Sequence, residues 1–251
     1  MIGQLGATSV HGFYFETGVI VVVATMTALA LAKYFQKGRN RPAFLLFMVF
    51  LNWTIGVVIS WLAKIFSGFL GLDTIHITDF TSYMIRMVLD FRLLFVFVAI
   101  ALYCSYVLRV LLFEKEYNRG EQAVNVVFLI SIPVLCFVLE TSDAINSFYT
   151  IIVFLVVFLD MLFVYSRFMK HALAQYKTAS EKFKGAFKAL TLQALFFILT
   201  FLFFLLDQVM IPIQEAFGDP NPGYTVFYFG AWISAVVGMV LTYYGYIKPR
   251  A

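Results

Sequence analysis

The sequence has few charged residues and no long polar stretch. Asp, Glu, Lys and Arg make up 13% of the 251 residues, whereas hydrophobic residues make up 62%. Soluble domains contain about 25% charged and about 45–50% apolar residues. The longest mainly polar stretch, Arg167 to Lys188, is too short to form a soluble domain. The scarcity of charge therefore excludes an ordinary soluble fold.

Cysteine and histidine are also scarce. Cys104 and Cys136 both lie in apolar runs, so they predict neither an extracellular disulfide framework nor a CxxC metal site. The three histidines, His11, His76 and His171, fall in the amino-terminal tail or in connections between apolar runs. A haem held between two spans needs axial ligands within those spans. We therefore expect no metal site and no haem.

Other signatures of catalysis and cofactor binding are missing. The last apolar run lacks the central lysine that a retinal Schiff base requires. Neither the HExxH of zinc proteases nor the GxSxG of serine hydrolases is present. The Asp-Arg-Tyr and Asn-Pro-x-x-Tyr patterns of G-protein-coupled receptors are absent as well. The sequence therefore predicts no cofactor, no catalytic residue and no enzymatic activity.

What the chain does contain is a series of apolar runs, each long enough to cross a bilayer. A helix needs about 20 apolar residues to span about 30 Å of hydrocarbon. Seven runs qualify: 13–35, 43–66, 83–112, 123–139, 148–168, 187–209 and 224–246. They are continuous rather than alternating, which favours helices over a barrel. We predict an all-α, multi-pass protein of the cell membrane, with residues 1–251 forming a single seven-helix domain.

The distribution of positive charge predicts the orientation of this bundle. Of the 18 Lys and Arg residues, 15 lie at the end of the first, third, fifth or seventh apolar run, in the connection that leads from it into the next run, or in the carboxyl-terminal tail. Cytoplasmic loops carry an excess of Lys and Arg. We therefore expect the amino terminus outside and the carboxyl terminus inside. Because the basic residues lie in short loops between spans, the net charge of +4 does not indicate nucleic-acid binding.

Two short motifs accompany the seven-helix layout. Residues Gly38–Pro42 (GRNRP) lead into an aromatic-rich second run, and Tyr246–Pro249 (YIKP) close the seventh. With the layout, they resemble the amino-terminal seven-helix sensor region of some prokaryotic histidine kinases and related archaeal membrane proteins. The resemblance implies a receptor-like module for signal transduction. Such sensors usually continue into a signalling domain, whereas this sequence ends at Ala251, so the expected output partner is a separate cytoplasmic protein.

Five ionisable residues lie near the outer boundary of the predicted spans. They are Glu16, Arg86, Asp90, Arg92 and Asp207. Ionisable residues inside a membrane are costly, and they usually mark function or pairing. An outward-facing pocket for a ligand or ion could hold all five. Ion pairs that only lock the helices together are the alternative, and the sequence leaves both open.

The spacing of these charges predicts how they pair. Arg86 and Asp90 are four residues apart, so they share a face of one helix. In a continuous helix Arg92 would point to the opposite side. We therefore expect Arg92 to pair across helices with Asp207 or Glu16.

Asp160 lies deeper, in the apolar segment 154–164, with no basic residue expected at its depth. It is predicted to be protonated, because desolvation disfavours a carboxylate, or to bond hydroxyls such as those of Ser105 or Thr200. Two roles are open for Asp160: it could relay protons or cations, or it could hold helices together as a structural polar clamp.

The long inner connection is expected to extend its two helices beyond the membrane. Four of its lysines are candidates for docking a partner or anionic lipid: Lys170, Lys177, Lys182 and Lys184. Three functions remain open at this point. They are a receptor or sensor, a structural or accessory subunit of a larger membrane complex, and a transporter of small solutes or ions.

Overall fold

The computed structural model describes residues 7–36, 38–72, 76–114, 116–137, 143–217 and 225–246. Within these ranges the chain is all-α. The helices are α1 (Ala7–Gln36), α2 (Arg41–Lys64), the π-helical turn η1 (Ile65–Phe69), α3 (Phe80–Leu89), α4 (Arg92–Phe113), α5 (Arg119–Phe137), α6 (Asp143–Thr178), α7 (Glu181–Ala216) and α8 (Val226–Tyr246).

Seven of the described helices are long and apolar enough to cross a membrane. They are α1, α2 with η1, α4, α5, α6, α7 and α8. Each corresponds to one apolar run of the sequence, so the prediction of a seven-helix membrane protein is confirmed. The residues 138 and 139 at the end of the fourth predicted run lie outside the described residues.

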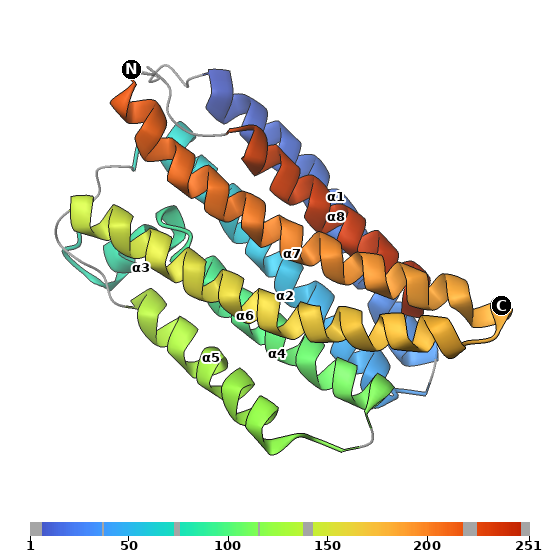
Figure 1. The fold of residues 1–251 in the computed structure, drawn as a ribbon. Coiled ribbons are helices and arrows are strands. Elements are labelled where there is room, and N and C mark those ends of the chain that lie inside the picture. Colours follow the sequence, from blue (N-terminus) through green and yellow to red (C-terminus); the bar gives the residue numbers. More distant parts are fainter. Residues whose placement is uncertain are drawn as a thin grey trace.

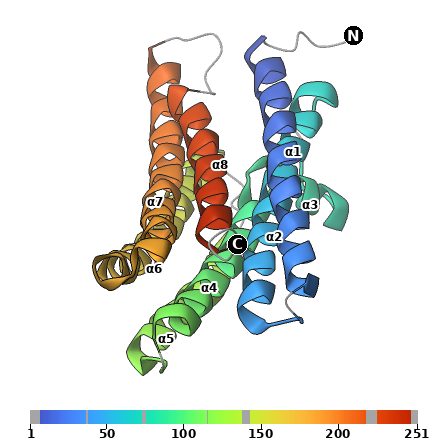
Figure 2. The ribbon, with the colours of Figure 1, turned by 90° about the vertical axis from the view of Figure 1, so that its right-hand side faces the viewer.

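The seven spans form a closed ring (Figures 1 and 2). Each span packs against the next along the chain, and α8 returns to pack against α1. α4 also packs directly against α6, so α5 lies at the periphery. With seven spans, α1 begins and α8 ends at opposite ends of the bundle, which we call the amino-terminal and carboxyl-terminal ends (Figure 1).

The third predicted run is not one helix. α3 ends at Leu89 and α4 begins at Arg92, with Asp90 and Phe91 between them. Phe91 has a φ of 58° and lies in the left-handed region, where a side chain other than glycine is strained. The prediction of a continuous helix over 83–112 was wrong. A run of apolar residues carries no signal for one residue with a positive φ, and such a residue is enough to end a helix. The chain therefore turns sharply at this point.

Side-chain caps define the start of two helices. The Asn40 side chain accepts a hydrogen bond from the Ala43 backbone N–H at 2.9 Å, and Pro42 occupies the first turn of α2. Asp79 and Ser82 form a reciprocal capping box at the start of α3. These caps satisfy backbone donors that the helix itself leaves unpaired.

The two longest helices form a hairpin that extends beyond the predicted spans. α6 continues past residue 168 to Thr178, and α7 starts at Glu181 rather than 187. Both helices therefore continue past the predicted span boundaries, and their extension beyond the membrane stays a prediction. Lys170, Lys177 and Lys182 are exposed along this hairpin end, and Lys184 is partly exposed.

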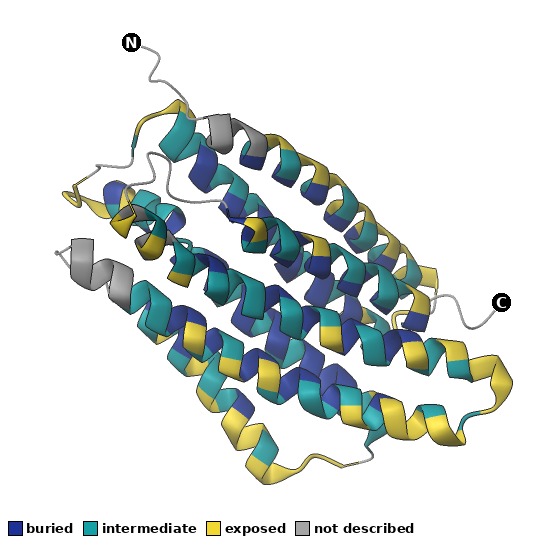
Figure 3. Ribbon diagram, turned by 45° about the horizontal axis from the view of Figure 1, so that its top comes forward, coloured by how far each residue is buried: buried dark blue, intermediate teal, exposed yellow. Residues whose placement is uncertain are grey.

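Buried and exposed residues alternate along the described spans (Figure 3), as expected for helices that pack one face against the bundle. Aromatic rings form much of this core. Trp53 of α2 stacks on Phe197 of α7 at a centroid distance of 5.3 Å, and Phe197 also contacts the Tyr165 ring at 5.0 Å. α2, α6 and α7 therefore meet through aromatic contacts in the middle of the bundle.

Candidate functional site

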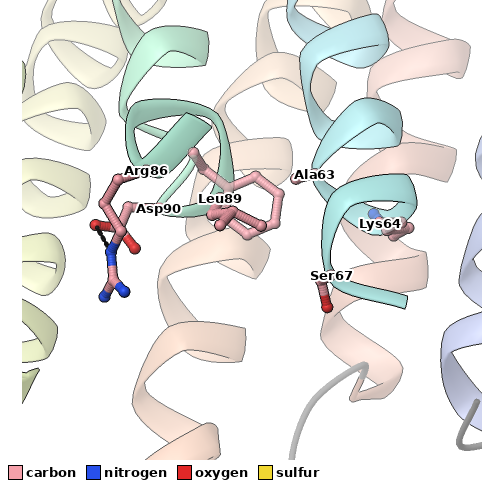
Figure 4. Close-up of a pocket in the computed structure, with 7 residues that line it drawn as sticks. Ala63, Lys64, Ser67, Arg86, Leu89 and Asp90 are labelled. Carbon is pink, nitrogen blue, oxygen red and sulfur yellow. Dashed lines mark hydrogen bonds and ion pairs between the residues drawn. The ribbon is translucent and has the colours of Figure 1, made fainter. Parts of the chain in front are cut away.

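A polar pocket lies at the amino-terminal end, between the end of α2 and the end of α3 (Figure 4). Its volume is about 230 Å³. The lining residues are Ala63, Lys64, Ser67, Arg86, Leu89, Asp90 and Phe91. The apolar side chains come from the same two helix ends as the charged ones. The pocket therefore offers two cations, one carboxylate and one hydroxyl against an apolar wall.

Lys64 forms the deepest charged contact at this pocket. Its Nζ atom lies 2.7 Å from Glu16 Oε1, and the two side chains are 2% and 0% exposed. The Ser60 hydroxyl donates to the same Glu16 oxygen at 2.7 Å, and the Tyr228 hydroxyl also donates to it. Lys64 Nζ also lies 5.0 Å from the centroid of the Tyr228 ring, within cation–π range. Glu16 thus collects donors from α2 and α8, which fixes α1 in the ring.

The helix break brings Arg86, Asp90 and Arg92 together. Asp90 Oδ2 accepts from Arg86 Nε at 3.1 Å and lies 3.9 Å from Arg92 Nε. Arg92 is fully buried, and its guanidinium lies 5.1 Å from the centroid of the Tyr149 ring of α6. One carboxylate therefore connects the pocket wall to the α4–α6 contact.

The prediction that Arg92 pairs with Asp207 or Glu16 was wrong. It assumed an unbroken helix in which Arg92 faces away from Asp90, whereas the left-handed turn at Phe91 rotates Arg92 back towards Asp90. Glu16 pairs instead with Lys64.

Asp207 belongs to a separate contact between α7 and the start of α8. Its Oδ1 atom accepts from the Thr225 hydroxyl at 2.6 Å and from the Thr225 backbone N–H at 3.1 Å. Thr225 Oγ1 in turn accepts from the Phe227 backbone N–H. Asp207 thus anchors the amino terminus of α8, the helix that carries Tyr228 into the Glu16 cluster.

Asp160 is buried in the middle of the bundle, as its sequence position predicts. It is 3% exposed, and its Oδ1 atom has no hydrogen-bond partner among the described residues. The expected hydrogen bonds to Ser105 or Thr200 are not formed. Ser105 donates to the Ala101 carbonyl, and Thr200 donates to the Phe196 carbonyl. Both hydroxyls satisfy a carbonyl of the preceding turn in their own helix.

A second ionic cluster, at the carboxyl-terminal end, was not anticipated. Glu121 at the start of α5 bonds both Arg109 of α4 and Arg167 of α6. Glu114 lies 3.6 Å from Arg109 and 3.0 Å from the His171 Nε2 atom. The Arg109 side chain is 1% exposed. The cluster fastens the peripheral α5 to the two helices behind it.

Two features of the sequence hid these contacts. Lys64 lies at the outer end of the second apolar run and was not among the candidate site residues, although Ser60, four residues earlier, puts a hydroxyl on the same helix face. Arg109 and Arg167 counted only towards the positive charge of the loops. The acidic residues Glu114 and Glu121 between these arginines were the available signal, because a carboxylate in a basic loop needs a partner.

Among the described residues no group of three or more His, Cys, Asp or Glu side chains is placed to hold a metal ion. Comparisons of the chain with models of protein families, with curated proteins and with solved structures found no match. The geometry of the site is therefore the basis for the function proposed below.

Proposed function

We propose that the chain is a sensory, receptor-like membrane module that binds a small polar molecule with an anionic group in the pocket at the amino-terminal end. The observation that carries this proposal is the pocket itself. Ligand sites combine an apolar wall with a few convergent polar groups. Arg86 supplies donors for an anion, Asp90 supplies an acceptor, Leu89 and Phe91 supply the apolar wall, and Lys64 adds positive charge behind that wall.

The proposed orientation places this pocket on the outside. The loops rich in Lys and Arg all belong to the carboxyl-terminal end, where α6 and α7 form the hairpin. Because positive loops remain in the cytoplasm, the amino-terminal end faces outward. A polar molecule can then reach the pocket without crossing the bilayer.

The proposed signal travels through the helix break. A ligand anion that contacts Arg86 competes with Asp90, and Asp90 also lies beside Arg92. Arg92 contacts the Tyr149 ring of α6, the helix that continues into the basic hairpin. The resemblance to seven-helix sensor regions supports this direction of signalling. A cytoplasmic signalling protein, or anionic lipid, is the proposed contact of Lys170, Lys177, Lys182 and Lys184.

A thermal-shift screen tests the proposal directly. Purified protein in lipid nanodiscs is heated with a panel of small carboxylates, phosphates, amines and neutral polyols. Ligands that bind only the folded state raise Tm by mass action. At least one anionic compound should raise Tm, and Arg86→Gln or Ser67→Leu should abolish that shift. Lys182→Gln, at the far end of the molecule, serves as the control that keeps it.

The alternative is a structural or accessory subunit whose buried charges only hold the helices together. The observation in its favour is the outward face of α5, which carries the exposed apolar residues Val127, Ile130 and Val134. A stoichiometric membrane protein that copurifies through this face, together with no stabilising compound, would favour the subunit function over the sensor. A transporter of small solutes or ions would instead catalyse uptake into sealed vesicles.

A further inference from the structure

Asp160 occupies an environment in which a carboxylate has no counter-charge. It lies in the middle of α6, 3% exposed, and it forms no ion pair with any of the described residues. The nearest cations along α4 and α6, Arg109 and Arg167, are bound to Glu121. Its Oδ1 atom also has no hydrogen-bond partner within the described part of the chain.

A string of buried hydroxyls lies between Asp160 and the carboxyl-terminal end. Tyr165, five residues further along α6 towards that end, is completely buried, and Tyr246 is the last residue of α8. The Tyr165 hydroxyl lies 3.0 Å from Ser105 Oγ. Because Ser105 donates its only proton to the Ala101 carbonyl at 2.8 Å, Tyr165 is the donor in that bond.

The Tyr246 hydroxyl completes this string. It is buried, and no hydrogen-bond partner for it lies among the described residues. Tyr165 is contributed by α6 and Tyr246 by α8, and Ser105 is the hydroxyl of α4 that bonds Tyr165. These hydroxyls lie on the carboxyl-terminal side of Asp160 along the bundle.

An ionised carboxylate in such surroundings is very unfavourable. Moving an isolated charge into an apolar medium costs so much that the group neutralises instead. Neutralisation requires a bound proton or a bound cation, and a cation needs several oxygen ligands around it. No described oxygen bonds Asp160 Oδ1, and the hydroxyls of Ser105 and Thr200 are engaged with carbonyls of their own helices.

We propose that Asp160 is a proton-binding site, occupied in the resting protein and reached from the carboxyl-terminal end through the hydroxyls of Tyr165 and Tyr246. Loss of this proton would leave a buried charge without a partner. Water or a partner group must then enter the bundle beside α6. The site is independent of the ligand pocket, because it uses none of the pocket residues.

Infrared spectroscopy of the protein in lipid membranes tests the proposal. A protonated buried carboxyl gives a C=O stretching band that an ionised carboxylate lacks, and the band shifts in D₂O. The wild type at neutral pH should show this band, and Asp160→Asn should lose it. Asp90→Asn, which changes an ion-paired carboxylate, should keep it. Asp160→Glu, which retains the acid, should shift the band and covers the case in which the asparagine variant does not fold.

Two further outcomes would overturn parts of the proposal. Identical wild-type and Asp160→Asn spectra in this region would mean that Asp160 is ionised. Loss of the band on adding Na⁺ at constant pH would replace the proton with a cation. The route is tested by the rate of the D₂O shift. Tyr246→Phe should slow it several-fold, and an unchanged rate would contradict entry from the carboxyl-terminal end.

Discussion

Lys64 and Glu16 form an ion pair of 2.7 Å with both side chains almost completely buried, at the amino-terminal end of a seven-helix ring. The pair joins the first two spans, and the Tyr228 hydroxyl adds the last span to the same carboxylate oxygen. Lys64 also lines the pocket. The contact that closes the ring is therefore part of the pocket wall.

Breaking this pair should strongly destabilise the protein. Lys64→Met leaves Glu16 buried without its cation, and we expect a loss of about 3–5 kcal/mol in the free energy of unfolding. Glu16→Gln in turn leaves Lys64 buried without its carboxylate, and we expect a similar loss in the free energy of unfolding. The Glu16→Gln/Lys64→Met double variant should lose less than the two single losses added together. Unfolding in mixed micelles measures all three.

The control for this prediction is the exposed pair Lys184–Glu181, whose side chains are 36% and 87% exposed. Lys184→Met makes the same chemical change, and it should cost less than about 1 kcal/mol because surface pairs contribute little. Equal effects of Lys64→Met and Lys184→Met would refute the structural role of the buried pair.

Glu121 should hold α5 against the bundle. Glu121→Gln removes the nearer carboxylate from Arg109, whose side chain is 1% exposed, and leaves Glu114 at 3.6 Å, so a cost below the roughly 3–5 kcal/mol of a fully broken buried pair is expected. Hydrogen exchange should accelerate in α5 more than in α7. Glu116→Gln, an identical change at an exposed position of the same loop, should leave both rates unchanged. Protection of α5 that survives Glu121→Gln would show that apolar packing alone retains this helix.

Gly245 should tolerate no larger residue, because α7 and α8 approach closely there. A Cβ atom at Gly245 would lie 2.4 Å from Leu190 Cδ2 and 3.4 Å from the Ala186 carbonyl oxygen. Gly245→Ala should therefore cost about 1–3 kcal/mol through overpacking. Gly18→Ala, where nothing lies within 4 Å of the added atom, should be neutral or slightly stabilising. A tolerated Gly245→Ala would mean that the two helices are further apart.

The N-cap of α3, Asp79, should stabilise the helix in a pH-dependent way. The Ser82 backbone N–H donates to Asp79 Oδ1 at 2.7 Å, and this bond holds the pKa of the carboxyl below its ordinary value of 3.8. A lowered pKa means that the ionised cap stabilises α3 above that ordinary value and loses its effect as the pH falls through the folded pKa. Asp79→Ala should speed hydrogen exchange in α3 at neutral pH, and the difference from wild type should vanish in strong acid. A difference that persists in acid would contradict this assignment.

The membrane fold was predictable because many residues of each span contribute to the same hydrophobic pattern. Each span consists of about twenty mostly apolar residues, so its prediction does not depend on any single residue. The same averaging missed the break at Phe91, where one reversed φ separates α3 from α4. That error also produced the wrong partner for Arg92, since helix periodicity holds only within a continuous helix.

The candidate site was predictable as a set of residue types but not as a set of contacts. Glu16, Arg86 and Asp90 stood out because charges in a membrane are rare. The burial of Lys64 was not visible, because a lysine near the end of a span can equally reach the headgroups. The buried ammonium of Lys64 packs against the ring of Tyr228, which is more than 160 residues away in the chain. Only the closed ring brings these two side chains together.

The most direct test of the account is whether the pocket is open to the outside of the cell. In a background with Cys104→Ala and Cys136→Ala, the Ser67→Cys variant places a thiol in the pocket lining. A membrane-impermeant maleimide should label it in intact cells, whereas Lys182→Cys on the hairpin should be labelled only after permeabilisation. Labelling of Lys182→Cys in intact cells, with Ser67→Cys protected until permeabilisation, would contradict the outward-facing pocket.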